Sequence, residues 1–122
     1  MNKEFIPYEQ ALELRQLGFN EHCFGKWQNL KIGKNLVVDE EDRIYDISML
    51  GADIKAPLYQ QAFRWFREKH RLFNQINIHT YFIYDISNDE FKMIRKYYKV
   101  TNTYEEAELA CLRKLIEIVK NK

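Results

Sequence analysis

Glycine and proline are scarce in this sequence, which has four glycines and two prolines among 122 residues. Long flexible linkers are built mainly from these residues, so the composition argues against an extended disordered segment. No stretch approaches the roughly 18 apolar residues of a membrane-spanning helix, and the first residues form no apolar leader. We therefore expect a single domain over residues 1–122 that is cytoplasmic and contacts no membrane.

Cysteine is equally rare, and Cys23 and Cys111 lie far apart along the chain. They match neither a metal-ligand spacing nor a disulfide framework. We interpret them as small buried side chains in a reducing compartment. Charge of one sign is not in excess either: 19 Lys and Arg face 18 Asp and Glu, for a net charge of +1. A protein held to nucleic acid by bulk charge is normally more basic than this.

Motifs of catalysis are also missing, because the sequence has no glycine-rich phosphate loop and no nucleophile elbow. His22 and Cys23 are neighbours, but adjacent residues of a strand point to opposite faces and cannot form a nucleophile–base pair. His70 falls on the apolar face of an expected helix, where a structural role at the helix C-terminus suffices. We expect no catalytic residue, no cofactor and no metal, and hence not an enzyme.

What the sequence does have is a recurring helix start. Three times a tyrosine is followed by two Glu or Gln residues and an alanine, beginning at Tyr8, Tyr59 and Tyr104. A proline or threonine stands just upstream each time, and these residues pre-set or cap the first turn of a helix. The starts predict three helices, at about residues 7–17, 57–71 and 103–120.

The ends of two of these helices are also marked. Gly18 is a natural left-handed stop for the first helix, with Phe19 beyond it to pack back. Thr103 with Glu106 three positions later predicts a capping box at the start of the last helix.

Strands are expected between the helices. Short aromatic or apolar stretches predict strands between residues 22 and 47, near 23–27, 36–38 and 44–49, and residues 48–56 are expected to be a loop. Strict alternation predicts one strand over residues 74–84. Residues 91–100 are predicted to be the second strand of a hairpin, although Ser87 and Glu90 could cap a helix there.

The predicted order is therefore α-β-β-α-β-β-α. Strands that follow each other closely in sequence form antiparallel pairs. We expect an α+β fold in which the three helices cover mainly one face of an antiparallel sheet.

Three stretches match sequences of a known kind: IPYEQALELRQLGFNEHCF (6–24), APLYQQAFRWFREK (56–69) and TYEEAELACLRKLIEIVKNK (103–122). They resemble a group of small proteins from Bacteroidetes bacteria and their phages and prophages, which has no assigned activity. The resemblance covers a little under half of the chain. It implies a small accessory product of a mobile element and carries over no catalytic residue.

Two basic clusters are candidate binding sites for an anion such as a phosphate backbone. One is a helical stripe and the other lies in the expected second hairpin strand: Arg64, Arg67 and Arg71, then Lys92, Arg95, Lys96 and Lys99. The alternative is that each cluster is simply the solvent-exposed face of its element and binds nothing. The C-terminal half also resembles a double-stranded-RNA-binding domain in its element order, but Glu105 and Glu106 at its last helix would repel phosphate.

Apolar residues in unexpected places suggest a protein-binding surface. Trp65 lies at the edge of the apolar face of the second helix, and Leu109 and Ile116 fall outside the apolar arc of the last. Our leading hypothesis is a non-enzymatic adaptor of phage or mobile-element type that binds a protein partner, with homodimerisation as one form. The alternatives are a nucleic-acid-binding module that uses the basic clusters and a protein that binds or sequesters a nucleotide-like ligand.

Overall fold

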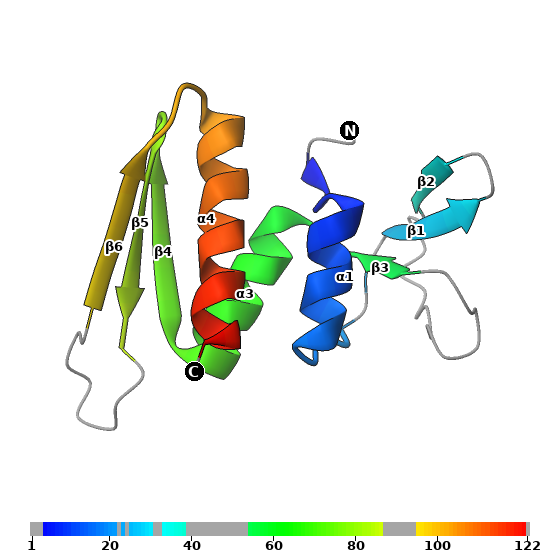
Figure 1. Cartoon of the computed structure of the whole chain (residues 1–122), viewed down its shortest axis with the longest axis horizontal. Helices are drawn as coiled ribbons and strands as arrows, with labels where there is room; N and C mark the ends of the chain where they lie inside the picture. The colour runs from blue at the N-terminus through cyan, green and yellow to red at the C-terminus, as the bar shows by residue number, and fades with distance from the viewer. Residues whose placement is uncertain are drawn as a thin grey trace. The chain divides into compact units, whose positions relative to one another are not determined.

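The computed structural model describes residues 4–21, 23, 25–30, 33–38, 54–86 and 95–121, with the backbone alone at 26–30, 33–38, 54, 95 and 96 (Figure 1). The order helix, strands, helix, strands, helix confirms the predicted α+β class, and each group contains three strands among the described residues. The chain divides into two compact units, Met1–Tyr59 and Gln60–Lys122. The prediction of a single domain therefore stays a prediction.

Helix α1 (Tyr8–Gln16) begins and ends within one residue of the predicted bounds, 7–17. Pro7 precedes it with φ −60°, and Gly18 ends it with φ 102°. The amide of Gly18 donates to Arg15 O and that of Phe19 donates to Leu14 O, both at 3.0 Å. This is the Schellman arrangement, which needs a left-handed residue at this position. Phe19 is buried, as expected of the residue that packs back.

The strands of the first unit form an antiparallel sheet in the order β2-β1-β3. Strand β1 (Gly25–Leu30) pairs with β2 (Gly33–Val38) and with β3 (Ile54–Ala56). These strands confirm the expected strand character near 23–27 and 36–38, while 44–49 lies outside the described residues. The loop predicted over 48–56 is wrong at its end, because Ile54 to Ala56 pair with Trp27 to Gly25.

A buried lysine explains why β3 is hard to recognise. Lys55 is 4% exposed, and its ammonium group donates to Asn20 Oδ1 at 2.9 Å. Lysine is almost never fully buried without such a partner. A lysine in the middle of a three-residue stretch therefore predicts a loop. The hydrogen bond to Asn20 allows the Lys55 side chain to be buried in a strand instead.

The second unit contains most of α3 (Tyr59–His70), then β4 (Leu72–Asn77), β5 (Thr80–Asp85), β6 (Arg95–Val100) and α4 (Tyr104–Lys120). The strands form a second antiparallel sheet in the order β4-β5-β6. Helix α4 packs against β4 and β5, and α3 lies on the same side of this sheet (Figure 1). The strands are thus divided between two sheets, whereas the sequence suggested one.

Strands β4 and β5 correct the prediction of one strand over 74–84. A two-residue turn at Ile78 and His79 reverses the chain, so that Asn77 pairs with Thr80. Ile78 takes a φ of 37°, which a β-branched residue rarely adopts. Glycine or asparagine normally marks such a turn, and its absence leaves the apolar alternation unbroken. Strand β6 confirms the strand predicted at 91–100 for its last six residues; residues 91–94 lie outside the described part.

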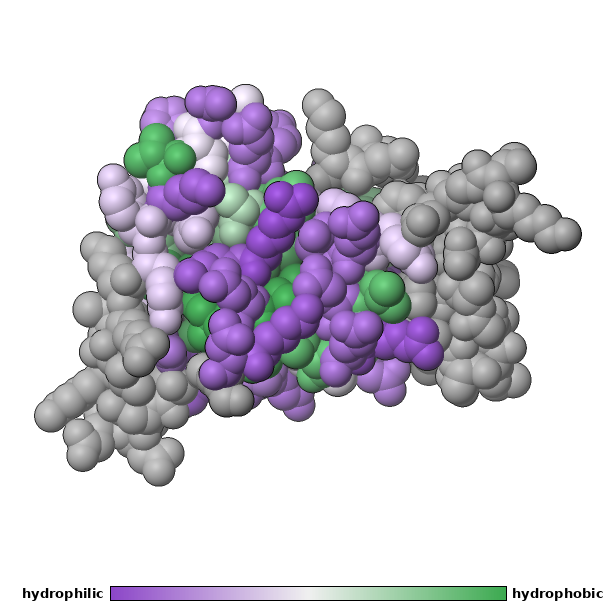
Figure 2. Space-filling view, viewed as in Figure 1, coloured by the Kyte–Doolittle hydropathy of each residue, from purple (hydrophilic) through white to green (hydrophobic). Residues whose placement is uncertain are grey.

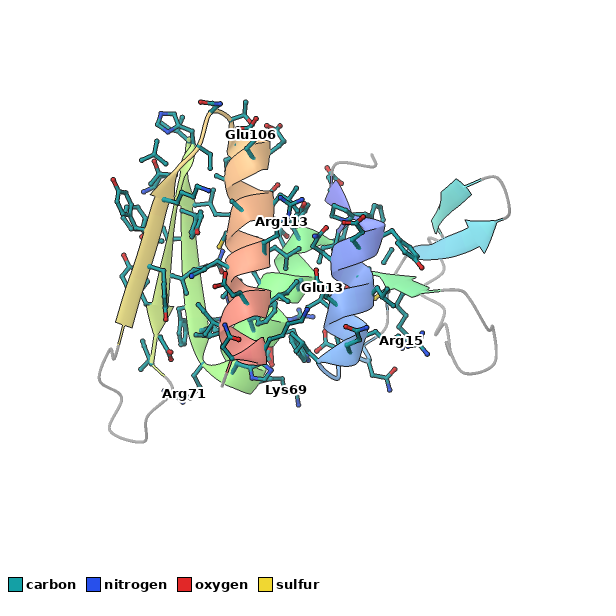
Figure 3. The ribbon with its side chains drawn as sticks, viewed as in Figure 1. Glu13, Arg15, Lys69, Arg71, Glu106 and Arg113 are labelled. Carbon is teal, nitrogen blue, oxygen red and sulfur yellow. The ribbon has the colours of Figure 1, made fainter. Side chains whose placement is uncertain are left out.

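The start of α4 confirms the predicted cap. Thr103 accepts a hydrogen bond through Oγ1 from the Glu106 amide at 3.1 Å, and Glu106 Oε2 accepts one from the Asn102 amide at 3.1 Å. Figure 3 shows Glu106 at this end of the helix. Glu105 and Glu106 also place negative charge at the positive end of the helix dipole.

The register separates two faces of the second sheet. On β5 the alternate residues Tyr81, Ile83 and Asp85 are buried, and they lie on the face that packs against α4. We call the opposite face the outer face. It comprises nine strand positions: Phe73, Gln75, Asn77, Thr80, Phe82, Tyr84, Lys96, Tyr98 and Val100. None of these is acidic.

Candidate functional site

Strand β6 is the outermost strand of its sheet in the described part of the chain, with β5 as its one strand neighbour. The amide of Thr101 donates to His79 O at 2.7 Å, which makes the adjacent pair Thr80 and Val100 a non-hydrogen-bonded pair. Pairs of the two kinds alternate along an antiparallel ladder. The N–H and C=O groups of Tyr98 and Val100 therefore point away from β5, toward the open edge.

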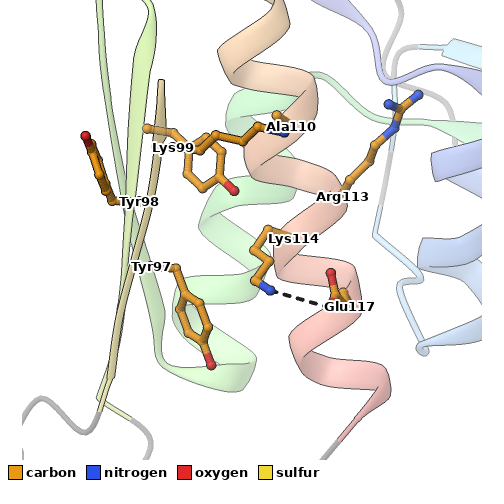
Figure 4. Close-up of a pocket in the computed structure, with 8 residues that line it drawn as sticks. Tyr97, Tyr98, Lys99, Ala110, Arg113, Lys114 and Glu117 are labelled. Carbon is orange, nitrogen blue, oxygen red and sulfur yellow. Dashed lines mark hydrogen bonds and ion pairs between the residues drawn. The ribbon is translucent and has the colours of Figure 1, made fainter. Parts of the chain in front are cut away.

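A cavity of about 470 Å³ lies between this strand and α4. We call it the β6–α4 groove, and Figure 4 shows its lining residues: Tyr81, Tyr97, Tyr98, Lys99, Ala110, Arg113, Lys114 and Glu117. The helical residues are spaced at three- and four-residue steps, so they form one stripe along α4. Ala110 is the smallest side chain of that stripe and leaves space opposite the strand.

Two lysines reach into the groove from opposite sides. Lys99 extends from β6 toward Ala110, and Lys114 extends from α4 toward β6 (Figure 4). The Lys114 ammonium lies 4.9 Å from the centre of the Tyr97 ring and 3.4 Å from Glu117 Oε1. Arg113 lines the rim, with its guanidinium directed away from β6 (Figure 4). The two lysines that reach into the groove carry more positive charge than the single carboxylate of Glu117 offsets.

The floor of the groove is a neutral phenol. Burial raises the pKa of Tyr81 above its ordinary value, and the neighbouring Cys111 and Glu117 raise it further. Tyr81 is 5% exposed. Its hydroxyl therefore stays protonated at neutral pH and does not offset the lysine charges.

Beside the groove, the outer face carries exposed aromatic and aliphatic side chains. Tyr98 is 62% exposed and Val100 53%. The Tyr98 ring stacks on Phe82 with centroids 5.5 Å apart and an interplanar angle of 24°. Ile78, 81% exposed, stands at the hairpin turn, and Figure 2 shows hydrophobic colour at this end of the sheet.

The first basic cluster is divided between exposed and structural roles. Arg64 and Arg67 are exposed on α3, but Arg64 pairs with Glu68 at 3.5 Å. Arg71 has a structural role, since its Nε donates to Ile86 O at 2.9 Å and its own carbonyl accepts from the Ile86 amide at 3.1 Å. Figure 3 shows Arg71 at the end of α3 beside the sheet.

The second cluster lies partly on the candidate site. Arg95 and Lys96 belong to β6, in register with Asp85 and Tyr84. Lys99, further along the same strand, lines the β6–α4 groove; Lys92 lies outside the described residues. Among the described side chains of the two clusters, Lys99 lines the groove, whereas Arg64 and Arg67 lie on α3.

The proposed apolar contact residues require correction. Trp65 is 4% exposed and packs edge-on against Phe66 and His70, with both centroid distances at 5.0 Å. Ile116 is 2% exposed, and Leu109 is half-buried. Helical periodicity places Trp65 at the edge of one apolar face and Ile116 outside another, but the structure buries both side chains.

The two cysteines and His70 are held in packed surroundings. Cys23 and Cys111 are free and buried, and burial raises the pKa of each thiol to about 12. His70 lies in the aromatic cluster with Trp65 and Phe66. In the described ranges, no three His, Cys, Asp or Glu side chains gather closely enough to hold a metal ion.

The sequence interpretation missed the helical half of the groove. Ala110, Arg113, Lys114 and Glu117 form the polar side of the last helix, which normally means a solvated face. A usable signal was the alanine within this polar stripe, because it leaves space next to an expected edge strand.

Comparison with known proteins adds no assignment. No protein-family model matches this sequence, and no curated protein or solved structure is significantly similar to it. Within the described residues, no helix combines the length and apolar character needed to cross a membrane.

Proposed function

We propose that this protein is a non-enzymatic adaptor that binds an extended segment of a partner protein as an additional strand on β6. The observation that carries the proposal is the edge of β6 beside the β6–α4 groove, which no other described strand covers. An edge strand presents unpaired N–H and C=O groups, and extended peptides are recognised by adding to such edges while their alternate side chains enter pockets.

The edge supplies the backbone contacts of this binding mode. Tyr98 and Val100 each offer one N–H and one C=O, and their side chains are among the most exposed apolar groups of the unit. A strand placed here would satisfy these groups at the ordinary spacing of about 4.8 Å between neighbouring strands. Exposed main-chain groups beside exposed apolar side chains favour a polypeptide over a small solute.

The charge of the edge disfavours a second copy of the same strand. Strand β6 carries Arg95, Lys96 and Lys99 and no acidic residue. Pairing two copies of β6 would gather six cations on two neighbouring strands, and like charges that lie opposite one another are destabilising. The outer face is also small. Three strands of six residues cover roughly 14 by 20 Å, or about 280 Å². A stable interface buries about 800 Å² per partner, so this face alone is too small for one.

The biological setting is part of this proposal. The resemblance of the three helical stretches to phage and prophage proteins supports an accessory role in a mobile element. Two free, buried thiols suit a reducing cytoplasm. Mapping the neighbouring genes tests the setting, since a position among housekeeping genes would contradict it.

The free edge makes a prediction for amide hydrogen exchange of the protein alone. The amides of Tyr98 and Val100 should exchange at least tenfold faster than those of Tyr97 and Lys99, because only the latter two donate to β5. Exchange followed by NMR checks this alternation. Equal protection of all four amides would show that β6 is not an open edge.

Binding itself is tested by selecting random twelve-residue peptides displayed on phage against the immobilised protein. Selected peptides are then measured by fluorescence anisotropy on the wild type and on Val100→Pro. Proline removes the N–H that faces the edge and leaves the ladder to β5 intact, as edge strands allow. We expect at least a tenfold loss of affinity, the cost of about one unmade hydrogen bond.

Two variants control this experiment. Val100→Thr keeps the N–H and should bind within about twofold of the wild type, whereas Ala110→Leu fills the groove and should weaken binding without changing charge. Equal binding by all three variants, or failure to select any peptide, would sink the proposal. Light scattering in parallel detects homodimers, and a dimer abolished by Val100→Pro would assign the edge to a second copy instead.

A second function is favoured by the lining of the groove. Tyrosines beside lysines and an arginine, in a cavity of about 470 Å³, fit a small aromatic anion such as a nucleotide, since ligand pockets typically measure 300–1,000 Å³. Nucleoside phosphates that raise the melting temperature of wild type and Val100→Pro alike, while no peptide binds, would support this reading.

A further inference from the structure

We propose that the segment bound to β6 is acidic at alternate positions, with carboxylates that face α4 and are recognised by Lys99 and Lys114. This inference rests on the strand addition proposed above and specifies the chemistry of the partner. It follows from the faces of the sheet, which give the two sides of an added strand different surroundings.

The register assigns the two sides. A residue placed opposite Tyr98 lies on the outer face, because directly opposed residues of neighbouring strands share a face. Its two chain neighbours then lie opposite Tyr97 and Lys99 and face α4. Side chains of an added strand therefore alternate between the stacked Phe82–Tyr98 pair and the β6–α4 groove.

The groove positions favour negative charge. Lys99 is exposed and Lys114 keeps 30% of its side chain exposed, so both ammonium groups are accessible. A carboxylate between them would receive hydrogen bonds from either side of the groove (Figure 4), and such charge-assisted bonds are stronger than neutral ones. The outer positions instead meet aromatic and aliphatic groups and favour apolar side chains.

Glu117 occupies part of this site in the free protein. Its carboxylate lies 3.4 Å from the Lys114 ammonium while its side chain remains 58% exposed. It shows that a carboxylate fits beside Lys114 at the mouth of the groove. A bound acidic residue would compete with it, which makes Glu117 an internal competitor for the partner.

The test compares a selected peptide with a version whose Asp and Glu residues are replaced by Asn and Gln. We expect the amide peptide to bind wild type about fivefold more weakly for each exposed ion pair lost. Lys114→Gln and Lys99→Gln should each reduce the difference between the two peptides. Glu117→Gln should tighten the acidic peptide about two- to threefold by removing the competitor.

The outcomes separate this inference from the proposed function. Equal affinity of the acidic and amide peptides would overturn the inference that the bound segment is acidic. If Val100→Pro still lowers the affinity in the same assay, the proposal of strand addition stands. If Val100→Pro does not change the affinity, both the proposed strand addition and the acidic segment are contradicted. Binding of a twenty-nucleotide oligothymidylate through Lys99 and Lys114, with no preference for the acidic peptide, would assign the cations to nucleic acid instead.

Discussion

Replacing Phe66 by alanine is expected to lower the free energy of unfolding by about 3–5 kcal/mol. Phe66 has no exposed surface and is the largest fully buried side chain of the described residues. Its ring lies 5.0 Å from that of Trp65 and 6.1 Å from that of His70, measured between centroids. Truncation removes these contacts and leaves a cavity that helix α3 cannot close without moving Trp65.

Urea denaturation followed by tryptophan fluorescence measures this effect, because Trp65 reports on the same cluster. The matched control is Arg67→Ala on the next residue, whose exposed side chain should change the free energy by no more than about 0.5 kcal/mol. A loss below about 1 kcal/mol for Phe66→Ala would show that this cluster is not part of the core.

Alkaline pH should destabilise the protein through its two thiols. Burial holds the pKa of Cys23 and of Cys111 at about 12, against 9.0 for an unperturbed thiol. The unfolded chain loses these protons above pH 9 and the folded chain keeps them until about 12. The contribution of the two thiols to the free energy of unfolding is therefore fully present below pH 9 and decreases between pH 9 and 12. Each thiol should lose about 1.4 kcal/mol by pH 10.

Denaturation curves at pH 8, 9 and 10 test the thiol contribution. In Cys111→Ala, the decrease in the free energy of unfolding between pH 8 and 10 should be about 1.4 kcal/mol smaller than in the wild type. In the Cys23→Ala, Cys111→Ala double variant it should be smaller by twice that amount. The variants also separate the thiols from tyrosines that titrate at similar pH. If the double variant falls as steeply as the wild type, the buried thiols do not govern alkaline stability.

The helices were predictable because their signals are local. Pro7 and Gly18 bracket α1, and Thr103 caps α4, each through bonds to residues within five positions along the chain. The fold class and element order follow from these signals and from alternation in the strands. The division into two sheets depends on pairings between distant segments, which local patterns do not specify.

The misplaced elements share one cause, which is that a residue breaks a local rule and tertiary contacts allow it. Ile78 turns the chain where glycine or asparagine is expected, and Lys55 is buried where an apolar residue is expected. Periodicity placed Trp65 at the edge of an apolar face and Ile116 outside one, but both are buried. Periodicity shows which face of a helix is most apolar. It does not show how many other elements pack against that helix.

The candidate site was predicted only in fragments. Lys99 was recognised only as a member of a basic cluster. The groove needs Ala110 and Lys114 from a helix that follows later in the sequence. The direction of the edge amides depends on the register between β5 and β6, and no composition or spacing rule supplies it.

The connection between α3 and β4 constrains how this sequence can vary. Arg71 alone links His70 to Leu72, with a φ of 55°. Because strand residues alternate between faces, one inserted residue here would exchange the buried and outer sets of β4, so that fully buried Leu72 would change places with its neighbour. Natural variants of this protein should therefore show substitutions but no gaps from Tyr59 to Asn77, and length changes should collect in other connections.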